Sequence, residues 1–325
     1  ILIWVGRDHL KAVLRKAFTG APEIDDSQEP FSYRTAVIAA LAGFAGMVIF
    51  GVAAGLWWWV AIIYFGICVL FSVVYARARA EAGAPLVWLF PISQAWEFMF
   101  NFTGSSIYQR GSSWKNMGAM GLFFWVARGY FPSMSGYQIE GFKIAEEAGI
   151  KQRTMVYWLI AALVIGLAGA YVIHLHAYYA YGANVLEGGT TQGGSRVQSA
   201  AIAWNALSAD VKAHEPMDWK QTGGAISGFV ITTLLIIMRT IFLRFPLHPL
   251  GFVMVTSMMN AIWGPFLIIW VIKSLILRIG GMGAYRRMIP FFLGLVIGHF
   301  FTAGVVWGSI SLYNDMYRRY GVWFG

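Results

Sequence analysis

The sequence predicts an all-α protein, a polytopic bundle of transmembrane helices that contains broken or re-entrant helices. Of its 325 residues, 58% are hydrophobic and only 12% are charged, about half the charged fraction of an ordinary globular domain. The stretch from Pro249 to Ile272 contains no charged residue and is long enough to cross a hydrocarbon core of about 30 Å. Gly264-Pro265 falls in the middle of that stretch, where proline removes a backbone hydrogen bond that lipid cannot replace. We therefore expect membrane helices that are interrupted at particular positions.

Residues 1–33 are predicted to form an amphipathic surface helix followed by an acidic linker. Gly6–Phe18 has apolar side chains on one face and basic side chains elsewhere, which is typical of a helix lying on a membrane surface. The linker GAPEIDDSQEP follows at 20–30. The chain begins with ILIWVG and lacks the charged start of a signal peptide. Because this beginning resembles the tail of a span, we expect an upstream half of the same polypeptide.

Residues 34–325 are predicted to form one transmembrane domain with five to seven spans. Apolar runs long enough to span occupy Thr35–Ala54, Leu56–Tyr75, Met155–Tyr178, Ala225–Phe242 and Met288–Leu312. Ala84–Phe102 is interrupted by two prolines, and Met117–Ala127 is too short to span alone. These two segments are either re-entrant half-helices or one span and one buried segment.

The placement of Lys and Arg in short loops predicts the orientation through the positive-inside rule. It assigns Gln138–Arg153 to the cytoplasm and the polar stretch Gly182–Gly224 to an external loop. Within that loop, apolar residues recur at helical spacing over Arg196–Ala213, which predicts a short surface helix. Basic residues flank Pro249–Ile272 at both ends. This stretch therefore either spans the membrane or re-enters with a turn at Gly264-Pro265.

Polar residues inside the interrupted segments are the candidate site, because broken helices often mark the binding site of a transporter. A carboxylate in an apolar segment is costly and serves either a solute path or a structural partner, and both interpretations of Glu97 remain open. At the second break, Asn260 is placed either to supply the missing backbone hydrogen bonds or to contact a solute, Trp263 to form an apolar wall and His299 to be a polar neighbour. A modest packed proline kink is the alternative there. The candidates are Glu97, Asn101, Asn260, Trp263, Gly264, Pro265 and His299.

Several function classes find no support in the sequence. It contains no HExxH motif, no Cys/His cluster and no nucleotide-binding glycine motif, and Cys68 is its one cysteine. We therefore expect no enzyme activity, no metal and no cofactor. The net charge of +9 comes from loops beside apolar spans, so we expect no nucleic-acid partner. Single histidines on two helices leave a haem-binding subunit as a third hypothesis.

Five stretches carry a resemblance to a known family: 29–34 (EPFSYR), 76–85, 141–153, 244–252 (RFPLHPLGF) and 263–281. They resemble the C-terminal half of large bacterial multi-pass membrane proteins of unknown function, which are distantly similar to the oligopeptide transporter family. The resemblance implies a helical transporter-like fold in the bacterial cytoplasmic (inner) membrane. It transfers no functional residue.

The leading functional expectation is secondary transport of a small polar or peptidic solute. The alternative is a non-transporting accessory or structural subunit of a larger membrane complex, and the third is a haem- or quinone-binding subunit. The expected partners are the lipid bilayer and either the upstream half of the same polypeptide or other membrane subunits. The sequence identifies neither the substrate nor the coupling ion nor the oligomeric state.

Overall fold

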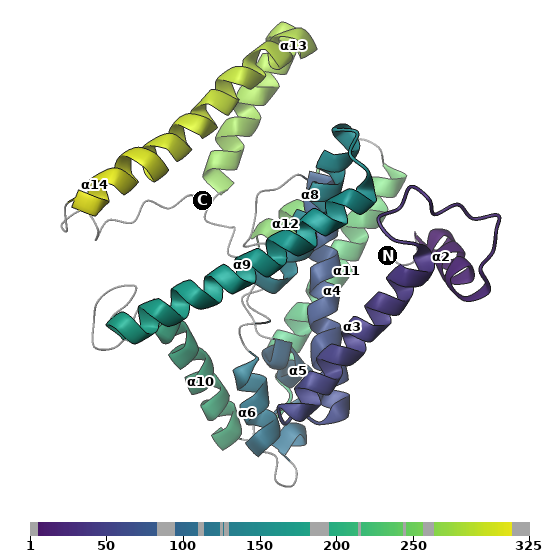
Figure 1. The fold of residues 1–325 in the computed structure, drawn as a ribbon, viewed down its shortest axis with the longest axis vertical. Coiled ribbons are helices and arrows are strands. Elements are labelled where there is room, and N and C mark those ends of the chain that lie inside the picture. The colour runs from purple at the N-terminus through teal and green to yellow at the C-terminus, as the bar shows by residue number, and fades with distance from the viewer. Residues whose placement is uncertain are drawn as a thin grey trace. The chain divides into compact units, whose positions relative to one another are not determined.

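The computed structural model describes residues 6–82, 95–109, 114–123, 126, 130–182, 195–213, 216–242, 245–255 and 263–313. In these ranges the chain is helical without any strand, which confirms the all-α prediction (Figure 1). Five helices are long and apolar enough to cross a membrane. The elements are α2 (Arg7–Thr19), α3 (Tyr33–Ala53), α4 (Trp58–Ala82), α5 (Ala95–Thr103), η1 (Ser106–Gln109), α6 (Trp114–Leu122), α8 (Tyr130–Glu147), α9 (Gln152–Tyr181), α10 (Ser195–Ala213), α11 (Trp219–Ile241), α12 (Pro249–Val255), α13 (Trp263–Phe300), η3 (Phe301–Trp307) and α14 (Gly308–Tyr313). They divide into two units, Ile1–Asn260 and Ala261–Gly325.

The central helix of the first unit is α4. Of the most apolar 18-residue stretch of α4, 39% is buried, whereas the other four candidate spans bury 6% or less of theirs. It contacts α3, α5 and α8, and its contact with α8 is the most extensive in the described chain. Helices α3, α5 and α8 therefore pack around α4.

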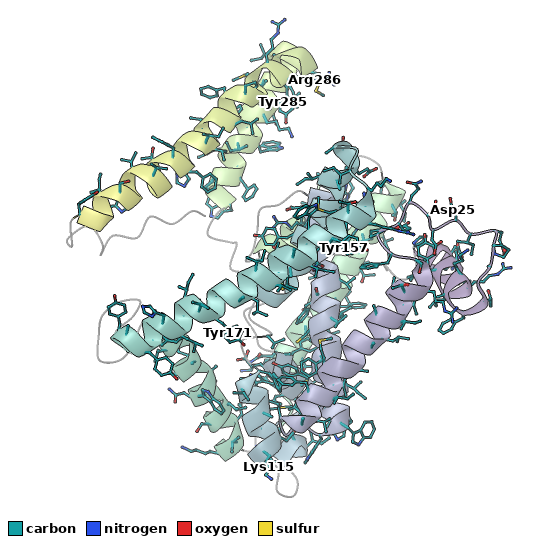
Figure 2. The ribbon with its side chains drawn as sticks, viewed as in Figure 1. Asp25, Lys115, Tyr157, Tyr171, Tyr285 and Arg286 are labelled. Atoms are coloured by element: carbon teal, nitrogen blue, oxygen red, sulfur yellow. The ribbon has the colours of Figure 1, made fainter. Side chains whose placement is uncertain are left out.

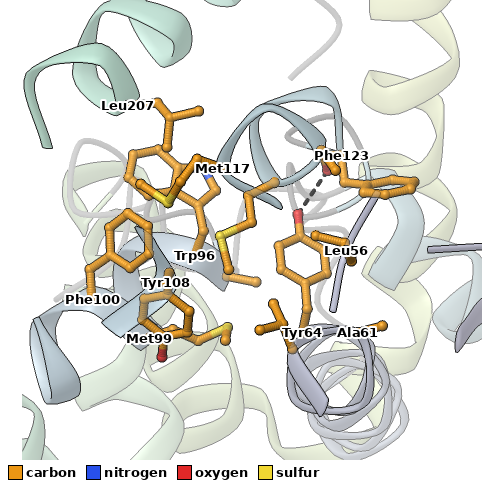
Figure 3. Packing of buried hydrophobic residues seen from close by; sticks show 14 of the residues in the cluster. Leu56, Ala61, Tyr64, Trp96, Met99, Phe100, Tyr108, Met117, Phe123 and Leu207 are labelled. Carbon is orange, nitrogen blue, oxygen red and sulfur yellow. Dashed lines mark hydrogen bonds between the residues drawn. The ribbon is translucent and has the colours of Figure 1, made fainter. Parts of the chain in front are cut away.

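The main buried cluster surrounds the first half of α4 (Figure 3). Two helices of nine residues each, α5 and α6, supply much of it, and α10 contributes Leu207 and Val211. Its largest fully buried side chains include Trp96, Tyr64 and Tyr108. In lipid, close packing of this kind holds helices together, because burial from water contributes little.

The amphipathic helix α2 leads into the linker before α3. It ends at Gly20, whose φ of 69° is left-handed and whose N–H bonds to the carbonyl of Lys16. Leu14 and Phe18 stay exposed, 47% and 75% respectively. In the linker, Ser27 donates two hydrogen bonds to Asp25, which lower the pKa of that carboxyl.

Helix α11 begins at Trp219, inside the segment predicted as loop. The side chain of Asp218 accepts hydrogen bonds from the N–H groups of Lys220 and Gln221, at 2.9 and 3.1 Å. This N-cap starts the helix before Gly223 and Gly224, which sequence reasoning treated as loop residues.

The second unit is a helical hairpin. Gly281 lies within α13 at a non-helical φ of 61° and ψ of −165°, and Figure 1 shows the two legs folding back on one another there. The Nζ of Lys273 lies 5.3 Å from the ring centre of Tyr285 and joins the legs near the turn. The first leg, Trp263–Gly280, has a length of about 27 Å at 1.5 Å per residue. The hairpin turns at Gly281, whereas Gly264 and Pro265 lie in the first turn of α13; residues 256–262, between α12 and α13, lie outside the described residues.

Candidate functional site

Helices α6 and α8 lie one after the other along α4, like two halves of one broken helix. The contacts advance in step along both chains: α8 packs closely along α4 and runs parallel to it, whereas α6 meets the beginning of α4 through Trp57 and Tyr64. The pairs are Trp57 with Asn116, Tyr64 with Phe123, Ser72 with Ser135, and Arg79 with Glu140. Between the two halves, α6 ends at Leu122 and α8 begins at Tyr130. Of the residues between them, the structure describes Phe123, which lies in a turn facing Tyr64 of α4, and Val126, which is helical.

A buried hydrogen bond satisfies the backbone at the end of α6. The hydroxyl of Tyr64 donates to the carbonyl oxygen of Phe123 at 2.9 Å (Figure 3), and the N–H of Val126 donates to the same oxygen at 3.0 Å. Tyr64 is fully buried. Because an unpaired carbonyl in lipid costs several kcal/mol, these two donors make the interruption compatible with a membrane interior.

The first half, α6, is fixed by a buried amide. Asn116 is fully buried; its Oδ1 accepts from the N–H of Trp57 at 3.0 Å, and its Nδ2 donates to the carbonyl of Tyr108 at 3.2 Å. The backbone at Gly55, whose φ is 113°, passes close to the start of α6: a Cβ there would lie 3.3 Å from the carbonyl oxygen of Lys115. The turn before α4 and the start of α6 are therefore held together tightly.

The second half, α8, is fixed to α4 by polar contacts. Arg79 is only 8% exposed and binds Glu140 through two hydrogen bonds, from Nε to Oε1 at 2.5 Å and from Nη2 to Oε2 at 2.9 Å. The guanidinium also lies 4.3 Å from the ring centre of Tyr137. The hydroxyl of Ser135 donates to the carbonyl of Ser72 at 2.9 Å. A paired, buried charge of this kind is a feature of membrane segments with a functional or locking role.

Asn101 connects α5 to the start of α11. Its carbonyl accepts from the N–H of Asp218 at 3.1 Å and from the hydroxyl of Thr222 at 2.6 Å, and its Nδ2 donates to Gln221 at 2.8 Å. These bonds satisfy a carbonyl at the end of α5, so Asn101 acts here as a structural link. Glu97 lies one turn earlier on α5 and is partly exposed.

The remaining sequence candidates lie on or near the hairpin. Asn260 is outside the described residues. Trp263, Gly264 and Pro265 form the first turn of α13, where the missing N–H of proline costs little. His299 lies as far after Gly281 as Trp263 lies before it, so the hairpin brings both to its open end. The ring of His299 lies 5.9 Å from that of Phe300.

A hollow of about 670 Å³ opens beside the first half of the broken helix. One face of α6 lines it, together with the last turn of α3 and Trp204 of α10. A smaller hollow of about 230 Å³ shares Gly118 and Trp204 with it. Lys115 stands at the rim and is exposed (Figure 2). The α6 residues in the larger hollow are Lys115, Gly118, Ala119 and Leu122.

A protein-family model, described as a family of unknown function, matches residues 1–324. The chain belongs to the DUF6785 family. The match to DUF6785 covers all the described elements, from α2 through the hairpin. No curated protein and no solved structure matches the chain.

Sequence reasoning considered Met117–Ala127 as a half-helix, paired with Ala84–Phe102, but did not connect it with α8. It treated Arg79 as a basic flank of a span, but the structure makes it the buried partner of Glu140. The two residues are 61 positions apart, so no periodic pattern connects them. The small residues Ser135 and Gly136 next to an isolated glutamate were the available signal for close packing. Among the described residues, no three His, Cys, Asp or Glu side chains gather into a metal-binding group.

Proposed function

We propose that this protein is a secondary transporter that moves a small polar or peptidic solute across the inner membrane of a bacterium, related in mechanism to oligopeptide transporters. The observation that carries this proposal is the interrupted α6/α8 helix, whose two halves meet α4 at Tyr64 and at Ser72. Transporters use such discontinuous helices to expose polar backbone groups at mid-membrane depth.

The two half-helices would present opposite charges toward the interruption. The end of α6 carries the negative end of its dipole and suits a cation or a proton, whereas the start of α8 carries the positive end and suits an anionic group. The hollow along α6 gives a route from the predicted external end. The Arg79–Glu140 pair lies at the other end of α4 and would close the predicted cytoplasmic side.

The proposal is tested by fastening α8 to α4. In a Cys68→Ala background, Ser72→Cys and Ser135→Cys replace two hydroxyls that are 2.9 Å apart. The purified full chain is reconstituted in proteoliposomes under a proton gradient, with labelled trialanine as the solute and a pH-sensitive dye inside. We expect uptake by the parent protein, loss of uptake after oxidation of the double-cysteine variant, and recovery after reduction. Each single-cysteine variant is the matched control.

The proposal would be contradicted if the parent protein showed no solute uptake and no proton flux. Uptake that continues through the oxidised, cross-linked variant would show that α8 does not move during transport. Uptake through the cross-linked variant would refute a role for the broken helix in the mechanism, but it would not refute the proposed transport activity.

One observation favours a second candidate, an accessory subunit of a larger membrane complex. Within the first unit, α3 and α9 each bury only 6% of their most apolar 18-residue stretch, and α11 buries none of its own. These faces are available to lipid, to the hairpin or to partner helices. Co-purification of stoichiometric partner chains, together with no transport by the isolated protein, would support this candidate.

A further inference from the structure

Two hollows meet around Phe31, between the start of α3 and the start of α9. The first, of about 340 Å³, is walled largely by apolar side chains of α8 and α9. The second, of about 360 Å³, has a polar lining that includes Ser32, Thr35 and Arg153. The two share Pro30, Phe31, Val156 and Ile160. They therefore form one groove with an apolar part and a polar part.

The polarity of this groove changes with depth along α9. Its polar part begins at Arg153, in the first turn of the helix, and its apolar part extends to Leu163. Ten residues of helix separate these positions by about 15 Å along the axis. Because α9 is a candidate span, a helix that crosses the membrane would place the polar part nearer the membrane surface and the apolar part among the acyl chains.

Among the described residues, the cationic side of the groove has no acidic partner. Arg153 and Lys151 are exposed, and neither forms an ion pair with any described residue. The carboxylate in the groove lining is Glu29, which lines the apolar part and accepts a hydrogen bond from Tyr33 at 3.2 Å. Phe31 borders both parts. A negative group is consequently attracted to the Arg153 part and repelled from the Glu29 part.

We propose that this groove is a binding site for an anionic glycerophospholipid. The phosphate lies against Arg153 with Ser32 and Thr35 as hydroxyl donors, and one acyl chain fills the hollow lined by Leu159, Ile160 and Leu163. The order of head and chain in the lipid matches the order of polar and apolar lining along α9. Basic pockets between membrane helices bind phosphorylated headgroups in this way. This site is independent of the transport proposal.

The site is tested by native mass spectrometry of the detergent-purified full chain, titrated with palmitoyl-oleoyl phosphatidylglycerol. We expect Arg153→Gln to weaken binding about fivefold, the effect of one surface cation near an anionic headgroup. Arg286→Gln, an exposed arginine of the hairpin, is the control for loss of one positive charge and should leave binding unchanged. Phosphatidylcholine should bind more weakly than phosphatidylglycerol to the parent protein.

A second pair of variants tests the acyl-chain part of the groove. Ile160→Trp fills the hollow, and Ile160 is 51% exposed, so the larger ring can be accommodated without unfolding α9. Ile165→Trp places the same ring on α9 at a residue that is 71% exposed and outside the groove lining. We expect loss of the bound lipid only with Ile160→Trp, with Leu163→Phe as a second filling variant.

Three results would overturn the site. Equal weakening by Arg153→Gln and Arg286→Gln would indicate diffuse surface attraction. Unchanged binding in both filling variants would place the lipid elsewhere. Displacement of a co-purified quinone by Ile160→Trp, without any effect on phosphatidylglycerol, would assign the groove to a different amphiphile.

Discussion

The close approach of α8 to α4 at Gly136 gives a prediction with an internal control. An ideal Cβ at Gly136 would lie 2.6 Å from Cδ of Arg79 and 2.9 Å from Cε1 of Tyr75. At Gly141, on the same helix, the nearest atom is Cδ2 of Leu159 at 3.4 Å, which is an ordinary contact. Alanine therefore fits at the second glycine and collides at the first.

The expected magnitude follows from two effects. Both Gly→Ala substitutions gain the same helix propensity, about 1 kcal/mol, so the difference between the variants isolates the contact. Overpacking a close interface costs about 1–3 kcal/mol, and displacement of Arg79 also disturbs its hydrogen bonds to Glu140. We expect Gly136→Ala to be less stable than Gly141→Ala by about 1–3 kcal/mol.

The assay is equilibrium unfolding of the full chain in bicelles by SDS, followed by tryptophan fluorescence. Gly118→Ala on α6, where a Cβ meets nothing within 4 Å, shows the gain in propensity alone. Equal stabilities of Gly136→Ala and Gly141→Ala would refute the close packing of α8 on α4 and, with it, the alignment of the broken helix.

Three further predictions concern polar groups. Glu140→Gln leaves Arg79 buried without its charge partner and should cost about 3 kcal/mol of unfolding free energy, whereas Arg79→Met with Glu140→Leu should recover most of that loss in the same SDS titration. Tyr64→Phe should cost about 1 kcal/mol, because a second donor still pairs with the same carbonyl; a loss above that of Glu140→Gln would contradict this. Burial, chiefly, and the charge of Arg239 hold the pKa of His248 below its ordinary value, so α12 should lose stability as the pH falls through about 6.5. Hydrogen exchange of α12 at pH 7.5 and 5.5 measures this, and His248→Asn should abolish the difference.

The sign of the His248 prediction follows from its role at the start of α12. Its Nδ1 accepts a hydrogen bond from the N–H of Leu250 at 3.0 Å, which requires an unprotonated Nδ1. Nε2 lies 3.7 Å from Oε1 of Glu81, and this contact opposes the depression of the pKa only in part. The folded state thus favours the neutral ring, and the unfolded state binds more protons below the ordinary pKa.

Long apolar helices were the readily predicted part of the fold. The span predicted at Met155–Tyr178 is observed as Gln152–Tyr181, and the helix predicted within Arg196–Ala213 is observed as Ser195–Ala213. Hydropathy and helical period are local properties, so they are visible in one segment of sequence. The start of α11 was placed too late, because a single capping residue, Asp218, determines it.

The candidate site depended on contacts that no local pattern encodes. Sequence reasoning treated 117–127 and 138–153 as separate features, the first as either a re-entrant half-helix or a buried segment and the second as a cytoplasmic segment. They become the two halves of one broken helix only when both align with α4, through residues about 60 positions apart. Glu97 and Asn101 were identified by their cost in lipid, and the hydrogen bonds of Asn101 show a structural way to meet that cost.

The two halves of the broken helix are held by different kinds of contact. Helix α6 is fixed among buried aromatic and methionine side chains and by the buried amide of Asn116, contacts whose loss would leave voids and an unpaired polar group. Helix α8 makes the most extensive helix contact of the described chain, with α4, and is also fixed by Ser135 and by the pairing of Glu140, itself 38% exposed, with Arg79. If α8 separates from α4 during transport, water can reach Glu140, but the buried Arg79 loses its charge partner at a cost of about 3 kcal/mol. The Ser72→Cys and Ser135→Cys cross-link therefore tests a motion that the contacts of this state oppose.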